Sequence, residues 1–217
     1  MTLKELERLV QRGENECLEF KHKAADPQKI MKEVVAFSNH KGGRLIVGVD
    51  DDTTIRGVKF VEEEEYVLTQ AIHKYCKPVP QYSIEKIPIT AKRSVLIYSI
   101  KESEKKPVFL IYNFKRKTGR AYYRYLDKSV QASWELRQIM KARHKKSEFS
   151  WFEYGELERK LMKRLDETTT ISVDAFAEFA NISPKKASET LVQLTISNVL
   201  DILPSDEQDL FYIKTED

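Results

Sequence analysis

The stretch of residues 36–52, AFSNHKGGRLIVGVDDD, constrains the fold of this chain more than any other. Residues 44–49 form a nearly continuous apolar run, which is typical of a strand covered on both faces. Gly42 and Gly43 come just before this run and can end a preceding helix, because glycine adopts positive φ. Three aspartates follow at 50–52, a pattern that favours a turn. The stretch therefore predicts a helix, a glycine turn and a buried central strand.

Apolar periodicity around this stretch predicts a mixed β-sheet with helices, which is an α+β fold. Residues 17–22 alternate apolar and polar side chains, as a half-buried strand does. Asp26 and Pro27 are suited to cap and to begin the helix that precedes the glycine pair. Further helices are predicted over residues 3–12, 62–76 and 133–143, and further strands over residues 82–89, 94–100, 107–113 and 121–126.

Charge divides unevenly along the 217 residues, which include 37 Lys and Arg and 34 Asp and Glu. Residues 1–149 have a net charge of +10, whereas residues 150–217 have a net charge of −7. Opposite signs in the two parts suggest two domains with different roles. We place the first domain at residues 1–143, a linker at 144–150 and the second domain at 151–217.

The second domain has the predicted element order of a winged helix-turn-helix. Leu157, Leu161 and Leu165 recur every four residues in its first helix. Ser172 and Ser183 are suited to cap two more helices, and two short strands flank the loop of residues 204–209. The predicted architecture is thus an α+β domain followed by a small winged helix.

The sequence lacks the motifs of several classes of functional site. The patterns GxxxxGK[ST], GxSxG and HExxH are absent, and the four histidines lack metal-ligand spacing, so we expect no cofactor. No apolar run reaches the ~18 residues of a transmembrane helix, and we expect no membrane partner. Two cysteines without metal spacing, together with an N-terminus that lacks a signal-peptide pattern, favour a cytoplasmic location.

Carboxylates remain as candidates for chemistry. Glu14 and Glu19 flank the start of the first strand, and Asp50 and Asp51 follow the central one. If these strands are neighbours, three carboxylates could bind Mg²⁺ or Mn²⁺ through oxygen, as phosphodiester-cleaving sites do. The alternative is structural, because aspartates are common in turns. Lys21 shares a strand face with Glu19 and would then neutralise that glutamate.

Residues 13–21, GENECLEFK, and residues 36–58, AFSNHKGGRLIVGVDDDTTIRGV, together resemble the Schlafen-type AlbA-like family. The family pattern is a glutamate, four residues and Glu-Phe-Lys, then a helix ending Ala-Phe-Ala-Asn-Thr-x-Gly-Gly. An apolar strand ending Gly-Val-Asp-Asp and a turn into Gly-Val follow. His40 stands where the pattern usually has threonine. The resemblance extends over residues 1–143.

This resemblance implies an α+β fold and nucleic-acid binding. In the vertebrate branch, two glutamates and an aspartate cleave RNA with a divalent metal. That chemistry would assign catalysis to Glu14, Glu19 and either Asp50 or Asp51, with Glu14, Glu19 and Asp51 holding Mg²⁺ or Mn²⁺. Many bacterial members look like regulators in which this domain is fused to a winged helix, the layout predicted for this chain.

Basic and aromatic residues interleave in residues 113–125, NFKRKTGRAYYRY. Cations neutralise phosphates, and aromatic rings stack on unpaired bases. The same stretch also predicts a hairpin with residues 115–119 at its tip. The cations expected at a nucleic-acid interface are Lys21, Lys23, Lys115, Arg116, Lys117, Arg120, Arg124 and Lys128.

The function expected from the sequence is binding of nucleic acid, either DNA or RNA, by a transcriptional regulator without catalysis. The first alternative is a divalent-metal-dependent ribonuclease that uses the carboxylates named above. The second alternative is a protein-interaction module whose acidic C-terminal domain forms a homodimer.

Overall fold

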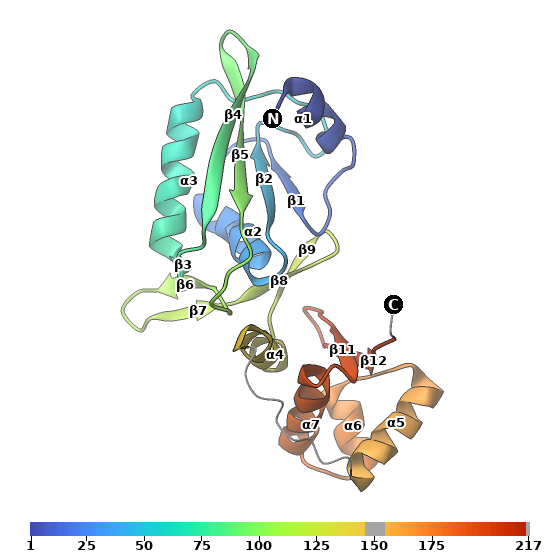
Figure 1. Ribbon diagram of the computed structural model, residues 1–217. Helices are drawn as coiled ribbons and strands as arrows, with labels where there is room; N and C mark the ends of the chain where they lie inside the picture. Colours follow the sequence, from blue (N-terminus) through green and yellow to red (C-terminus); the bar gives the residue numbers. More distant parts are fainter. Residues whose placement is uncertain (146–154, 216–217) are drawn as a thin grey trace. The chain divides into compact units, whose positions relative to one another are not determined.

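The apolar run of residues 44–49 lies at the centre of a four-stranded sheet in the computed structural model, which describes residues 1–145 and 155–215 (Figure 1). The central strand pairs in parallel with β1 and antiparallel with β5, and β4 pairs antiparallel with β5. The predicted α+β fold with a mixed sheet is therefore confirmed. In the order β1-β2-β5-β4, the strands are β1 (Leu18–Lys21), β2 (Gly43–Val47), β5 (Arg93–Ile100) and β4 (Tyr82–Thr90).

Three helices cover the two faces of this sheet: α1 (Leu3–Val10), α2 (Pro27–Asn39) and α3 (Val61–Tyr75). Leu45 and Val47 share one core with α2 and α3, whereas Ile46 and Val49 share the other with α1. All four side chains are fully buried. Burial of such a side chain contributes about 1.5 to 3 kcal/mol, so these residues fix the register of the central strand.

The turn between α2 and β2 depends on its two glycines. Gly42 has a φ of +80°, and a Cβ there would lie 2.6 Å from the carbonyl oxygen of Ile100. A Cβ on Gly43 would lie 2.4 Å from the ring of Phe37. Both contacts are closer than carbon atoms tolerate, so the chain can turn tightly against the sheet only with glycine at these positions.

Asn39, the last residue of α2, ties this turn to two distant strands. Its buried amide donates to the carbonyl oxygens of Val108 and Tyr122, at 2.9 and 2.8 Å, and accepts from the N–H of Val108 at 2.7 Å. Because these partners lie 69 and 83 residues away in the chain, the amide fixes the later strands against the end of α2.

A second group of short strands includes the predicted hairpin. β6 and β7 pair antiparallel around a turn that holds residues 114–117, so a hairpin follows β6 as predicted. Its second strand, however, overlaps the predicted tip of residues 115–119, and the strand predicted at residues 121–126 forms β8, which pairs with β9 instead. β6 and β8 both contact α2. The strands of this group are β3 (Cys76–Lys77), β6 (Phe109–Asn113), β7 (Thr118–Arg120), β8 (Tyr122–Tyr125) and β9 (Lys128–Gln131).

The C-terminal part of the chain contains four helices and a three-stranded sheet of order β10-β12-β11 within the described residues. Leu161 and Leu165 are buried inside this unit, so the leucine stripe packs internally. None of the described helices has the length and apolar character of a membrane span. The elements are α4 (Trp134–Lys145), α5 (Glu156–Thr168), β10 (Thr170–Ile171), α6 (Val173–Ala180), α7 (Pro184–Ile196), β11 (Leu200–Leu203) and β12 (Leu210–Ile213).

The chain divides into two units at Val130 and Gln131, earlier than the boundary predicted at residues 143 and 144. The reason is that α4 packs on α7 of the second unit. Ser188 donates to Glu135, and Arg143 pairs with Asp201 at 3.0 Å. An apolar stripe on a helix does not reveal which domain it contacts. Of the predicted linker, residues 146–150 lie outside the described residues.

His40 occupies a partly buried site just after α2. Its Nε2 lies 3.2 Å from a carboxylate oxygen of Glu16, whereas its Nδ1 is buried without a hydrogen-bond partner. The ring meets the ring of Tyr123 edge-on at 4.9 Å. Burial lowers the pKa of His40, an effect that the nearby cations Lys41 and Lys106 reinforce and that Glu16 opposes.

We predict that His40 makes stability depend on pH. Because its pKa is lowered on folding, the unfolded chain takes up the proton first. The free energy of unfolding should therefore fall as the pH drops below about 6.5, by at most about 1.4 kcal/mol per pH unit. Urea denaturation between about pH 7.5 and 5.5 should show this slope, and His40→Thr should flatten it. Equal slopes in the two proteins would contradict the prediction.

Candidate nucleic-acid interface

A groove of about 810 Å³ opens in the first unit between the N-terminal half of α2, the end of β1 and strands β6 to β8. Its lining is mainly basic and aromatic, with two carboxylates. The lining residues are Lys21, Lys23, Ala25, Asp26, Gln28, Lys29, Ile30, Lys32, Glu33, Leu110, Tyr112, Arg120 and Tyr122. Five cationic side chains thus surround one hollow.

Regular periodicity places these side chains together. Leu110 and Tyr112 are two residues apart on β6 and therefore point to the same face of the hairpin. Arg120 on β7 is the strand partner of Leu110, which brings it to that face as well. On α2, Lys29 and Lys32 are three residues apart and share the side that the core does not use. The groove is the space between these two faces.

Aromatic rings and cations are adjacent at two points of the lining. The guanidinium of Arg120 lies 5.5 Å from the ring centre of Tyr112, and the ammonium of Lys32 lies 5.4 Å from that of Tyr122. Such contacts are typical of cation–π pairs. They hold the cations at the groove without neutralising them.

The two carboxylates of the lining are already paired within the protein. Asp26 caps α2, accepting from the N–H of Lys29 at 3.2 Å and pairing with its ammonium at 3.3 Å. Glu33 pairs with Arg124 at 2.9 Å and accepts from the hydroxyl of Ser129. Burial is the main cause of the raised pKa of Glu33. The groove therefore presents an excess of positive charge to an incoming ligand.

Arg124 does not contact solvent, so its predicted place at the nucleic-acid interface is wrong. Only 1% of its side chain is exposed. Its guanidinium pairs with Glu19 at 2.8 Å as well as with Glu33, and lies 5.0 Å from the ring centre of Phe37. It also donates to the carbonyl oxygens of Asn15 and Leu18 and to the hydroxyl of Ser129. A sequence in which basic and aromatic residues alternate does not show which of the basic side chains is buried.

Glu19 and Glu14 serve as anchors for the first strand in this structure. Glu19 is 7% exposed, with one oxygen on Lys21 and the other on Arg124. Glu14 accepts from the N–H of Phe20 at 2.7 Å. Partial removal from water raises the pKa of Glu14. Lys21 does neutralise Glu19, as one of the two sequence interpretations predicted.

The aspartate run forms the predicted turn. Asp50 holds His22 through one oxygen and Arg56 through the other, and these partners lower its pKa. Asp52 accepts from the N–H of Thr54 at 2.9 Å. Asp51 is exposed. The turn therefore uses two of its three carboxylates to hold neighbouring parts of the chain.

The predicted metal cluster is not assembled. Within residues 1–145 and 155–215, no group of three or more His, Cys, Asp or Glu side chains is placed to hold a metal ion. Cations of the protein occupy both oxygens of Glu19, and Asp50 is engaged by His22 and Arg56. Because a hard cation would need these same oxygens, the residues do not fit Mg²⁺ or Mn²⁺, and no catalytic step follows from them.

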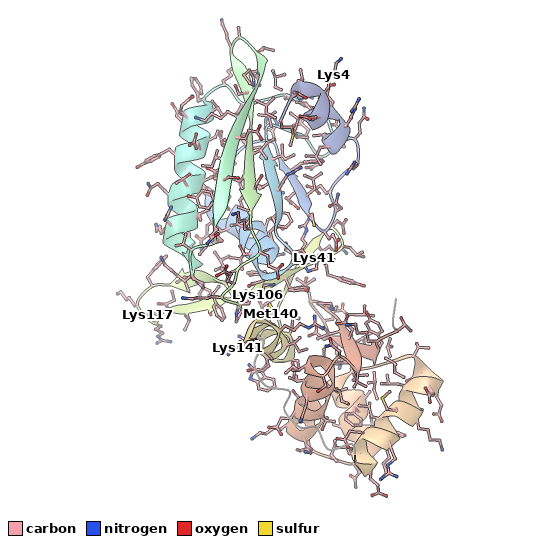
Figure 2. All side chains as sticks on the ribbon, in the orientation of Figure 1. Lys4, Lys41, Lys106, Lys117, Met140 and Lys141 are labelled. Carbon is pink, nitrogen blue, oxygen red and sulfur yellow. The ribbon has the colours of Figure 1, made fainter. Side chains whose placement is uncertain are left out.

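The remaining predicted cations are on the surface. Lys115, Arg116 and Lys117 are exposed at the tip of the β6–β7 hairpin, where Lys117 projects into solvent (Figure 2). Lys23 and Lys128 are exposed as well. Within the described part of the chain, none of these five side chains forms an ion pair. Their charge is available to a ligand.

Sequence reasoning missed Lys29, Lys32 and Tyr112, although a signal for the two lysines exists. The helical period that assigns Ile30 and Val34 to the core leaves Lys29 and Lys32 on the opposite side. That α2 faces the hairpin, however, depends on contacts between residues far apart in the chain.

Comparison with known proteins agrees with the fold. The profile of the family described as Schlafen, AlbA_2 matches residues 14–133, more than half of the chain. The chain therefore belongs to the Schlafen AlbA_2 family. This membership indicates a nucleic-acid-related role. No curated protein matches the chain.

Two solved structures are similar over 61% of this chain. The DIP2311 protein from Corynebacterium diphtheriae has a TM-score of 0.43 and 19% identity, and the match covers 27% of that protein, so this chain spans about a quarter of its length. The N-terminal domain of a RecG-related protein from Nitrosomonas europaea has a TM-score of 0.44 and 18% identity, with 94% of it covered. At TM-scores below 0.5, neither likeness adds to the family assignment.

We predict that Glu19 stabilises the fold. Glu19→Gln would leave the buried guanidinium of Arg124 with one carboxylate in place of two, and should lower the free energy of unfolding by about 3 kcal/mol. Chemical denaturation at neutral pH measures this. The control is Glu62→Gln, because the ion pair of Glu62 with Lys86 is exposed and its loss should cost less than about 1 kcal/mol. Similar small losses in both variants would argue against a structural role for Glu19.

Proposed function

We propose that this protein binds nucleic acid through the first unit, using the groove and the tip of the β6–β7 hairpin together. The observation that carries the proposal is the gathering of Lys21, Lys23, Lys29, Lys32 and Arg120 around one hollow beside two tyrosines. Asp26 is paired with Lys29, and Glu33 with Arg124 beneath the groove. Lys23, Lys32 and Arg120 form no ion pair among the described residues. A polyanion would therefore meet cations there and little opposing charge.

The hairpin tip extends the same positive surface. Lys115, Arg116 and Lys117 are exposed and carry no ion pair among the described residues. Cations of this kind release counterions from a phosphate backbone, which gives affinity with little sequence preference. The β6–β7 hairpin that ends in this tip also forms one side of the groove, so a single strand of nucleic acid could contact both.

We infer that the second unit is a winged helix and that the whole protein is a transcriptional regulator without catalysis. The order α5, β10, α6, α7, β11, β12 and the sheet order β10-β12-β11 support the winged helix. The family's nucleic-acid-related role supports the regulator. A cytoplasmic location belongs to the same proposal.

Contacts inside the second unit argue that its winged helix is not the main contact with nucleic acid. Ser188 of α7 bonds Glu135 of α4. In the loop between β11 and β12, Asp206 accepts from the N–H of Gln131 at 2.9 Å, and Asp209 accepts from a serine hydroxyl at 2.6 Å. The helix and loop that a winged helix would present to DNA are thus engaged by the chain itself, and the loop is acidic.

We predict that the hairpin tip contacts phosphates. Replacing Lys115, Arg116 and Lys117 by Gln should weaken nucleic-acid binding and lower the log–log dependence of affinity on salt by about 2 to 3, because each lost contact removes roughly 0.7 to 0.9. Fluorescence anisotropy across a salt series measures the slope. The matched control replaces Lys59, Lys92 and Lys101, which are exposed but do not line the groove.

The control triple variant should keep the slope of the unaltered protein. Equal reductions of the salt slope in the two triple variants would mean that only the net charge of the protein matters, and not the position of the cations at the hairpin tip. Failure of the unaltered protein to bind any DNA or RNA at low salt would end the proposal.

We also propose that the protein is a homodimer through the second unit. Trp134 and Phe179 are each 47% exposed, and they are the large apolar side chains left exposed in the described part of that unit. Burying them against a second copy would remove apolar surface from water.

The homodimer predicts a concentration-dependent mass. Light scattering coupled to size exclusion should give twice the chain mass of 25.4 kDa, and the variant with Trp134→Ser and Phe179→Ser should shift toward the monomer. The reason is that the double variant removes apolar surface without touching the core. A monomeric mass for the unaltered protein at every concentration would refute the dimer.

A further inference from the structure

The groove contains more than positive charge. Two tyrosines line it, and each ring makes a cation–π contact with a side chain of the lining. Arg120 contacts Tyr112, and Lys32 contacts Tyr122. The ring of Tyr112 is 53% exposed, although the residue stands within a lining that includes the buried side chains of Ile30 and Leu110. Phosphate binding does not account for an exposed ring in this position.

We propose that the groove takes an unpaired nucleobase, which stacks on Tyr112, while Lys23, Lys29 and Lys32 hold the flanking phosphates. The proposal rests on the proposed function and names its ligand class: single-stranded nucleic acid or an unpaired loop. Stacking on an aromatic ring requires a base whose face is free.

The dimensions of the groove favour an extruded base over a duplex. Its volume of about 810 Å³ is in the range of pockets that bind small ligands. In a duplex the base faces are covered by their neighbours, so a duplex could offer this hollow only its phosphates. The tyrosines would then contribute little.

The position of the cations matches a nucleotide rather than an isolated ring. Lys29 and Lys32 come from α2, whereas Tyr112 and Arg120 come from the facing hairpin. A base lying on the hairpin side would therefore place its sugar and phosphates toward α2. Lys23, at the end of the groove that β1 forms, is exposed and has no ion pair among the described residues.

The test compares Tyr112 with a tyrosine of similar exposure elsewhere. Tyr66 on α3 is 65% exposed and does not line the groove. The variants are Tyr112→Leu, which removes the ring, Tyr112→Phe, which keeps it, and Tyr66→Leu as the matched control. Each full-length variant is titrated against labelled single-stranded RNA, single-stranded DNA and the duplexes of the same sequences at fixed salt.

We expect Tyr112→Leu to weaken single-strand binding by about 5- to 150-fold, the range for loss of one base–aromatic stack. Its affinity for duplexes should stay within about twofold of the unaltered protein, because phosphate contacts are retained. Tyr112→Phe and Tyr66→Leu should bind single strands as the unaltered protein does. Circular dichroism of each variant checks that the substitution leaves the fold intact.

Three outcomes overturn the inference. Equal binding of single strands by Tyr112→Leu and the unaltered protein would mean that the ring does not stack. An equal loss for single strands and duplexes would mean that the ring only shapes the surface. In both cases the unaltered protein still binds, so the proposed function stands. If the unaltered protein binds neither form, the proposed function and the inference fail together.

A photocrosslink gives a second and independent measurement. Single strands that contain a photoreactive halogenated base should, after irradiation of the unaltered protein, attach to the peptide that contains Tyr112, as identified by mass spectrometry. Attachment confined to peptides outside the groove lining would overturn the inference even if the affinities agreed with it.

Discussion

The buried guanidinium of Arg124 is the interaction on which the first unit depends. Its charge is compensated by Glu19 and Glu33, so that a strand near residue 19, a helix near residue 33 and a strand near residue 124 are held at one point. Removing such a charge from water costs several kcal/mol, and only close carboxylates with further hydrogen bonds offset that cost. Glu33 also lines the groove, and Lys21, the partner of Glu19, does too. The groove thus takes its shape from the ion-pair network beneath it.

Local signals in the sequence were enough to predict much of the fold. The apolar run of β2 identified a strand covered on both faces, because an uninterrupted run has no polar side to present to water. The glycine pair identified the end of α2, since glycine adopts positive φ, as Gly42 does at +80°. A hairpin after β6 followed from the apolar residues that flank a polar tip, although its second strand was predicted at residues 121–126 and lies at residues 118–120. Each of these predictions needs only neighbours in the chain.

The site was less predictable because it depends on pairings between distant residues. Arg124 and Lys117 look alike in the sequence, yet one is buried by carboxylates 105 and 91 residues away and the other is exposed at a turn. Glu19 looked like a metal ligand until its partners were known. The helix α4 was assigned to the wrong unit for a similar reason, since its apolar stripe fits either neighbour. The charged residues of a sequence give the net charge of a domain, but they do not show which side chains face solvent and which are buried.

Asn39 shows how narrow the chemical tolerance of this arrangement is. Its amide both donates and accepts hydrogen bonds, and two of its partners are the carbonyl oxygens of Val108, just before β6, and of Tyr122, the first residue of β8. Aspartate has nearly the same size and shape, but it would set a carboxylate oxygen against those two carbonyls. Deamidation, the slow hydrolysis of asparagine side chains, converts the amide to a carboxylate and so makes this same change. Chemical ageing at one buried position would therefore loosen the hairpin from the helix without removing any packing volume.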